Sequence, residues 1–112
     1  MPNSYVPDAG DIVWLEFSPQ VGREQMGHRP ALVLSPASYN SKTNLMLCCP
    51  LSTKIKGYPF EVLIGEDQSS VALADQIKSL DWKVRNAKLK SKATEMELSA
   101  VRLKAIILIG KP

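Results

Sequence analysis

The sequence has one histidine and two cysteines among its 112 residues, too few for the common metal and disulfide frameworks. Cys48 and Cys49 are adjacent, and because neighbouring residues of a strand point to opposite faces, they form neither a disulfide nor a shared metal site. No C-x-x-C pair accompanies His28, so the sequence predicts no zinc site. The pattern is typical of two buried, reduced thiols in a cytoplasmic protein.

Long apolar runs and a targeting segment are also missing. No stretch approaches the roughly 18 apolar residues of a membrane span, so no membrane contact is expected. The opening residues, MPNSYVP, have neither the basic nor the apolar region of a signal peptide. Repeats, low-complexity tracts and glycine-rich phosphate loops are absent as well. We therefore expect a single domain spanning residues 1–112, located in the cytoplasm.

The net charge is small but unevenly placed. The 14 Lys and Arg residues against 11 Asp and Glu residues leave a net charge of +3. Residues 78–92 alone carry +5, because they contain six basic side chains and a single acidic one, Asp81. The six are Lys78, Lys83, Arg85, Lys88, Lys90 and Lys92. Such a run is usually a solvated face, but beside aromatic residues it becomes a candidate for nucleic-acid binding.

Aromatic residues are scarce, at 6% of the chain. Trp14 and Phe17 on the first expected strand, and Trp82 inside the basic run, could stack on nucleic-acid bases. Aromatic side chains more often belong to the core, so both interpretations stay open for each of the three.

Short β-branched and apolar segments between turn residues predict several strands. They cover residues 11–17, 31–35, 45–51, 60–64 and 71–77, and residues 83–90 suit an edge strand or a loop. Residues 18–30 are expected to form a long loop, residues 54–59 a basic turn, and residues 38–44 a helical turn or a loop. Pro50 places the end of the third strand at a bulge or a sheet edge.

One helix is well marked near the end of the chain. Thr94 and Glu97 form a capping box, and a broad apolar face follows them. Gly110 and Pro112 end this helix, although the β-branched residues 105–109 also suit an extended last turn. Many short strands and one terminal helix predict a mainly β fold with helical decoration (α+β), a small curled antiparallel barrel.

Residues 22–30 hold the densest set of reactive side chains. Glu24, His28 and Arg29 lie within six residues of one another. Arginine is a natural receptor for anions, and histidine titrates near neutral pH. A long loop without structure of its own is often functional, and the alternative is a solvated hairpin tip.

A second polar cluster follows the expected strand 45–51. The hydroxyls of Ser52 and Thr53 can cap a turn or bind a phosphate oxygen. Turn capping is the more frequent role, but Lys54 and Lys56 next to them favour phosphate binding.

Five stretches, taken in order, resemble the MazF/PemK family of toxin endoribonucleases. They are GDIVW at 10–14, GREQMGHRP at 22–30, LVLSP at 32–36, PLST at 50–53 with KGYPFEV at 56–62, and VALADQIKS at 71–79. The resemblance runs from residue 5 to residue 110, with matching order and spacing. The G-x-E-Q-x-G-x-R-P stretch is specific in combination.

The resemblance implies a two-fold homodimer of SH3-like antiparallel barrels, each with a C-terminal helix. It implies ribosome-independent cleavage of single-stranded mRNA at a short motif such as ACA, without metal or other cofactor. The implied partner is an acidic, MazE-like antitoxin whose disordered tail covers the RNA groove. Operator DNA is reached only through that antitoxin. An apolar helix face larger than one small barrel needs also favours the dimer.

The family's catalytic residues correspond to Arg29, Thr53 and Glu24. Candidate RNA-binding residues are Trp14, Phe17, Arg23, Gln25, His28, Ser52, Lys54, Lys56 and Lys78. Metal-free cleavage uses the substrate's own 2′-OH as nucleophile and leaves a 2′,3′-cyclic phosphate and a 5′-OH. With a single histidine in the chain, we expect Glu24, or a deprotonated partner group in its place, to take the 2′-OH proton. Arg29, which is almost never deprotonated, would hold the phosphate charge, and Thr53 would add a hydroxyl donor.

Two other functions fit parts of the sequence. Gyrase poisons related to CcdB share the implied fold, but they act through a C-terminal Trp-Gly-Ile, whereas this chain ends Leu-Ile-Gly-Lys-Pro. A non-catalytic SH3-like RNA-binding module would bind RNA without cutting it. Glu24, Arg29 and Thr53 together favour the nuclease.

Overall fold

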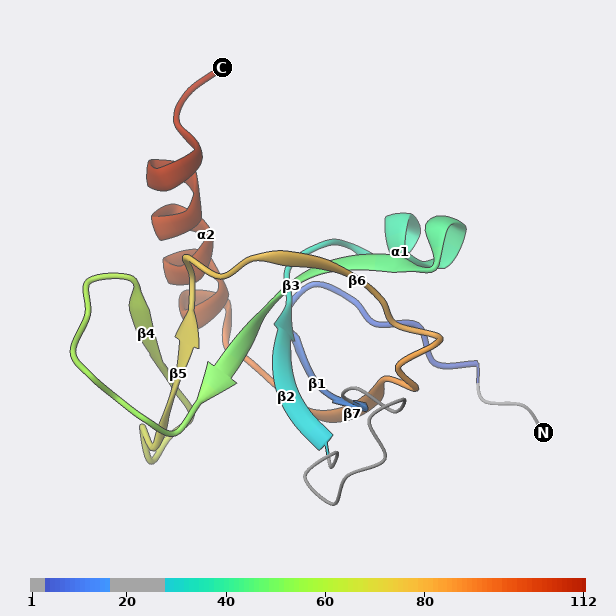
Figure 1. Cartoon of the computed structure of the whole chain (residues 1–112), viewed down its shortest axis with the longest axis horizontal. Coiled ribbons are helices and arrows are strands. Elements are labelled where there is room, and N and C mark those ends of the chain that lie inside the picture. The colour runs from blue at the N-terminus through green and yellow to red at the C-terminus, as the bar shows by residue number, and fades with distance from the viewer. Residues whose placement is uncertain (1–3, 17–27) are drawn as a thin grey trace.

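The computed structural model describes residues 4–16 and 28–112, which form a strongly curved β-sheet with two helices (Figure 1). The strands are β1 (Asp11–Glu16), β2 (His28–Val33), β3 (Leu45–Ser52), β4 (Glu61–Ile64), β5 (Ser70–Leu73), β6 (Lys78–Asp81) and β7 (Lys88–Lys92). The helices are α1 (Ala37–Thr43) and α2 (Glu95–Ile109). In Figure 1 the two helices lie near opposite ends of β3.

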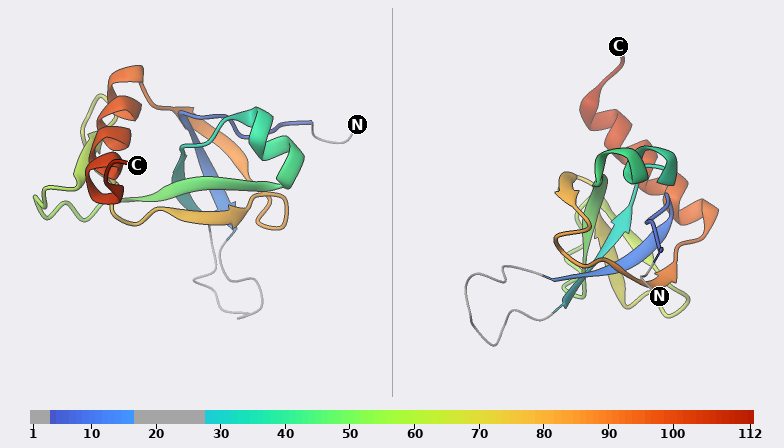
Figure 2. Two further views of the ribbon diagram at one scale, coloured as in Figure 1. Left: turned by 90° about the horizontal axis from the view of Figure 1, so that it is seen from above. Right: turned by 90° about the vertical axis from the view of Figure 1, so that its right-hand side faces the viewer.

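All strand pairs are antiparallel, which confirms the predicted mainly β fold with a C-terminal helix. The strand order is β4-β5-β3-β2-β1-β7, and β6 pairs with β3 outside this path. Within the described part of the chain the outer strands β4 and β7 do not pair, so the barrel is open on that side. Figure 2 shows how the sheet curls around its interior.

Strand β3 changes partners along one of its edges. It pairs with β2 on one side, and on the other side with β6 up to Cys48 and with β5 from Leu51. Along a strand, the backbone N–H and C=O groups of successive residues point alternately to one neighbouring strand and to the other. Leu47 O accepts from Leu34 N–H, so the backbone groups of Leu47 point to the side of β2. The nitrogen of Pro50, three residues further on, therefore points to the opposite side, into the gap between β6 and β5. Proline has no N–H to leave unpaired there. The predicted irregularity at Pro50 is therefore this change of partner.

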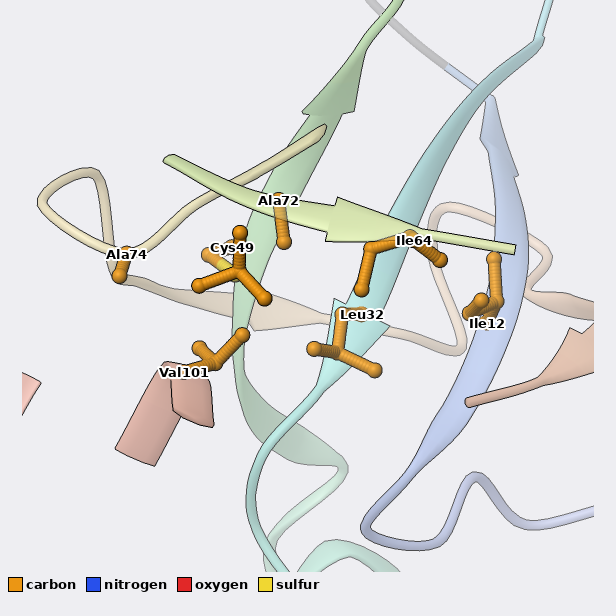
Figure 3. Close-up of a cluster of buried hydrophobic side chains, with 8 residues drawn as sticks. Ile12, Leu32, Cys49, Ile64, Ala72, Ala74 and Val101 are labelled. Atoms are coloured by element: carbon orange, nitrogen blue, oxygen red, sulfur yellow. The ribbon is translucent and has the colours of Figure 1, made fainter. Parts of the chain in front are cut away.

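The central strands bury both faces, so their apolar residues are nearly continuous. On one face Ile12, Leu32 and Cys49 pack with residues from β4, β5 and α2 (Figure 3). On the other face Cys48 packs with residues from β1, β2, β3 and the turn after β6, including Trp82. The two cysteines thus lie on opposite faces, buried and free of disulfides, as predicted.

Several predicted boundaries differ from the structure. Residues 28–30, expected in a loop, begin β2, because they pair with β1 from Trp14 to Glu16. The strand expected over residues 71–77 ends at Leu73, where a turn closes with Gln76 N–H donating to Leu73 O. Strand β6, which the sequence analysis missed, follows that turn.

The structure decides between the two conformations predicted for each of three segments. Residues 38–44 belong mostly to α1, which ends at Asn44 in the left-handed conformation (φ 62°). Residues 83–90 divide into a turn and the start of β7. The run 105–109 is helical to its last residue, so the extended alternative was wrong.

Helix α2 begins as the capping box predicts. Thr94 Oγ1 accepts from Glu97 N–H (3.0 Å), and the Glu97 carboxylate accepts from Thr94 N–H (2.9 Å). The same carboxylate accepts from Gly65 N–H (2.9 Å), which ties the helix start to the β4–β5 turn. Only Val101 and Ala105 of this helix are buried, so much of its apolar surface faces outward.

A buried polar network centred on Asn40 fixes α1 against the barrel. The Asn40 side chain accepts from Ser35 Oγ (2.6 Å) and donates to the carbonyls of Pro7 (2.7 Å) and Ser35 (3.0 Å). Its own carbonyl accepts from Trp82 Nε1 (2.9 Å). Among the described residues, every buried side-chain nitrogen or oxygen has a hydrogen-bond partner.

Replacing Asn40 with Ala should destabilise the fold by about 3 kcal/mol, because it removes three buried hydrogen bonds. Urea unfolding followed by tryptophan fluorescence measures the change. Ser41→Ala, in the same helix but exposed, is the matched control and should shift the free energy of unfolding by less than about 0.5 kcal/mol. Equal stability of the two variants would contradict this role of Asn40.

Candidate functional site

A hollow at the surface with a volume of about 550 Å³ lies where β1, β2 and β7 meet the ends of β3 and β5. We call it the central hollow. Its lining consists of Trp14, Arg29, Pro30, Leu51, Ser52, Thr53, Lys54, Ser69, Ser70 and Lys90. The charged side chains in this described lining are all cations, Arg29, Lys54 and Lys90. Such a hollow attracts anions, and its serine and threonine hydroxyls can donate to their oxygens.

Arg29 stands at a rim between the two faces of the sheet. Leu15 pairs with Arg29 and Trp14 with Pro30, so the register places Arg29 and Trp14 on opposite faces. Arg29 also lines a smaller hollow of about 170 Å³ on the other face, which we call the rear hollow and which includes Lys78. An exposed guanidinium at this rim can reach an anion in either hollow.

The structure separates the two tryptophans. Trp82 is buried, with 7% of its surface exposed, and donates to the Asn40 carbonyl, so it is a core residue. Trp14 is half-buried and lines the central hollow. The His28 ring meets it edge-on, with ring centroids 6.4 Å apart and planes inclined at 67°. Of the two tryptophans, Trp14 is therefore the one within reach of a ligand in the hollow.

The hydroxyls after β3 have different surroundings. Ser52 Oγ accepts from Lys54 N–H (3.0 Å), so it caps the turn, the more frequent of the two expected roles. Thr53 follows at the bend, exposed and within the lining of the central hollow. The turn cap thereby holds Thr53 and Lys54 at the mouth of the hollow.

The basic turn after β3 is ordered by a carboxylate from β4. Glu61 accepts from the backbone N–H groups of Lys56 (3.2 Å) and Gly57 (2.9 Å), and Gly57 has a positive φ of 78°. Lys56 Nζ lies 5.6 Å from the centre of the Tyr58 ring. Lys54 and Lys56 both line a further hollow of about 200 Å³, beside the central one.

The structure brings together most of the predicted residues that it describes. Trp14, Arg29, Ser52, Thr53 and Lys54 share the central hollow, Lys78 joins Arg29 in the rear hollow, and His28 contacts Trp14. Four predicted residues, Phe17, Arg23, Glu24 and Gln25, lie outside the described residues.

Sequence reasoning missed Ser69, Ser70 and Gln76 as members of the site. Ser69 and Ser70 enter the central hollow because β5 pairs with the end of β3. Gln76 belongs to both the rear hollow and the hollow of Lys54 and Lys56. No local pattern marks these residues, because strand pairing decides their position.

The cysteines near the rear hollow are not suited to nucleophilic chemistry. Burial raises the pKa of the Cys48 thiol to about 11, although Lys78 and Arg85 act in the lowering direction. Burial and the neighbouring Cys48 raise the pKa of Cys49 to about 12. Both thiols are therefore protonated at neutral pH.

In residues 4–16 and 28–112, no group of three or more His, Cys, Asp or Glu side chains is arranged to hold a metal ion. No helix in these ranges is long and apolar enough to cross a membrane.

Comparison with known proteins gives consistent matches over nearly the whole chain. A family described as PemK-like, MazF-like toxins of type II toxin–antitoxin systems matches residues 8–109. The endoribonuclease toxin MazF of Escherichia coli strain K12 is 50% identical over 111 residues, covering 98% of this chain and 100% of that protein.

Solved protein structures also resemble this chain. A MazF chain in a MazE–MazF crystal structure from Deinococcus radiodurans is 47% identical, with a TM-score of 0.86, and the match covers 97% of this chain and 100% of that one. An endoribonuclease from a mycobacterial species, in complex with its cognate antitoxin, shares the fold with a TM-score of 0.76 at 19% identity.

Proposed function

The chain belongs to the family of PemK-like, MazF-like toxins of type II toxin–antitoxin systems, and from that premise we propose how it acts. It is an endoribonuclease toxin. Its substrate is single-stranded mRNA, cut at a short motif without ribosome, metal or other cofactor, in the cytoplasm. ACA is the motif to test first. Cutting mRNA inhibits translation and arrests growth.

The observation that carries this proposal is the composition of the central hollow. Arg29, Lys54 and Lys90 supply positive charge, Thr53 supplies a hydroxyl, and Trp14 supplies an aromatic side chain. Single-stranded RNA is recognised by this combination of cations for the backbone and aromatic rings for the bases. Lys56 and Lys78, in the neighbouring hollows, extend the positive surface.

We assign the chemistry to three residues. Glu24, which corresponds to a catalytic residue of the family by sequence resemblance, takes the proton from the 2′-OH, and the 2′ oxygen attacks the adjacent phosphorus. Arg29 donates hydrogen bonds to the phosphate oxygens and stabilises the charge that develops on them. Thr53 donates one further hydrogen bond. The bond to the 5′ oxygen breaks, this oxygen takes up a proton from solvent water, and Glu24 later returns its proton to solvent, so the products are a 2′,3′-cyclic phosphate and a 5′-OH.

The cations of the central hollow also support an acidic antitoxin as the protein partner. An acidic, MazE-like tail would compete with RNA for the central hollow, because both are polyanions. The solved relatives include MazE–MazF complexes. Operator DNA would be contacted through the antitoxin, with this chain as co-repressor.

A homodimer is the assembly we propose. The apolar side chains Leu103, Ile106 and Ile107 of α2 are exposed by 60%, 56% and 65%, and Ile109 by 78%. Figure 1 shows the end of α2 extending beyond the sheet. A second copy of the chain would cover such an apolar face.

Digestion of a long single-stranded RNA in the presence of EDTA tests the function. We expect cleavage at a single short motif, with 5′-OH ends on the downstream fragments, because the substrate supplies the nucleophile. Mapping the 5′ ends identifies the motif, and supercoiled DNA with gyrase serves as the parallel assay for a gyrase poison. A strict requirement for Mg²⁺ would overturn the metal-free mechanism.

Arg29→Ala should lower the cleavage rate by about 10²- to 10³-fold, the usual cost of removing a positioned donor at a developing charge. Circular dichroism and light scattering should show an unchanged fold and assembly. Lys42→Ala, on the exposed face of α1, is the control for lost positive charge and should cleave normally. An Arg29→Ala rate near that of the wild type would refute the assignment.

Replacing Leu103 and Ile107 with Asp should convert the dimer to a monomer, because both lie on one exposed apolar face of α2. Light scattering at micromolar concentration should give the mass of two 12.3 kDa chains for the wild type and of one chain for the variant. Val84→Asp, an exposed apolar residue away from α2, is the control. A monomeric wild type would contradict the dimer.

A further inference from the structure

Lys90 occupies an unusual place in the sheet. Ile12 pairs with Ser91 and Val13 with Leu89, so Lys90 is the extra residue of a β-bulge in β7. A bulge redirects the side chain of its extra residue. Here Lys90 Nζ lies 5.3 Å from the centre of the Trp14 ring, on the wall of the central hollow.

The ammonium of Lys90 is available to an anion. Its contact with Trp14 is a cation–π interaction, and it forms no ion pair with a carboxylate among the described residues. Contact with the ring also restricts the flexible lysine side chain before a ligand arrives, which lowers the entropic cost of binding.

Lys90 lies between two hollows whose net charges differ in sign. On one side it lines the central hollow, whose described lining has no carboxylate. On the other side it lines an adjoining hollow of about 430 Å³, where the three carboxylates of Glu66, Asp67 and Glu97 outnumber the two cations, Lys90 itself and Lys92. The carboxylates of Asp67 and Glu97 are held by local donors, Ser69 and the backbone of Thr94 and Gly65. A phosphate is therefore favoured at Lys90 and disfavoured beyond it.

Lys90 and Arg29 serve different phosphates. They lie on β7 and β2, the two strands that flank β1, and the backbones of strands two apart are separated by about 10 Å. Arg29 also lines the rear hollow, whereas Lys90 lines a different neighbouring hollow, so a chain of nucleotides that crosses the central hollow can place a different phosphate at each cation.

We propose that Lys90, held over Trp14, is a second phosphate-binding subsite that anchors the RNA backbone at a nucleotide flanking the cleaved bond. This rests on the proposed function and extends it by a substrate-positioning residue. Lys90 fixes where the backbone lies in the central hollow, and the acidic adjoining hollow limits how far it continues on that side. Arg29 and Thr53 act at the cleaved phosphate.

Lys90→Gln tests the subsite with a short single-stranded RNA carrying 2′-O-methyl groups, which cannot be cleaved because the nucleophile is blocked. Fluorescence anisotropy over a range of salt concentrations measures binding. We expect Kd to rise about tenfold at low salt and the slope of log K against log salt to fall by about 0.7, the value for one phosphate contact on a single strand. Lys90→Arg should keep both near the wild-type values.

Lys42→Gln is the matched control, since it removes the same charge from an exposed site on α1 outside the hollows. If Lys90→Gln and Lys42→Gln have the same Kd and the same salt slope, the subsite is refuted. That result leaves the proposed endoribonuclease function unaffected. On cleavable RNA, Lys90→Gln should raise KM about tenfold with kcat nearly unchanged, in contrast to Arg29→Ala. A fall in kcat alone would also refute a binding role.

A wild-type chain that neither binds nor cleaves RNA would overturn the proposed function, and with it the subsite. Melting temperatures of all variants complete the test. A merely structural role for Lys90 predicts a lower melting temperature with an unchanged salt slope, which would count against the subsite.

Discussion

The change of partner along β3 is the constraint on which the rest of the structure depends. One edge of this strand pairs first with β6 and then with β5, and Pro50, without an N–H, stands at the change. The two pairings draw the sheet into a curl, with one apolar cluster on each face. The same change brings the start of β5 against the end of β3, where Ser52 and Thr53 meet Ser69 and Ser70 in the central hollow.

The site follows from this curl rather than from any single element. β1 and β2 carry Trp14 and Arg29 on opposite faces, and Arg29, near the start of β2, lines both the central and the rear hollow. β7 adds Lys90 through its bulge. Cations from three separate parts of the chain, Arg29, Lys54 and Lys90, thereby gather in the central hollow, which suits a polyanionic substrate that supplies its own nucleophile. A single histidine is then no obstacle to catalysis by an RNA-cleaving enzyme.

Sequence reasoning succeeded where local chemistry decides the structure. The capping box at Thr94, the burial of Cys48 and Cys49 on opposite faces, and the core strands follow from short-range pattern and alternation. It was wrong at residues 74–81, because strand β6 is short, half-exposed and recognisable only by its pairing with β3. His28 to Pro30 were expected in a loop for the same reason, since only their pairing with β1 makes them a strand.

The sequence by itself determined the family, the secondary-structure class and the residue types of the site, because these depend on composition, order and spacing along the chain. Only the tertiary structure decided which of the two tryptophans is core and which lines the hollow, and which lysines of the basic run lie near Arg29. Trp82 is enclosed through its bond to Asn40, whereas Trp14 lies beside Lys90. The physical reason is that exposure and proximity are set by strand register and by a bulge, and both arise from contacts between segments far apart in the chain.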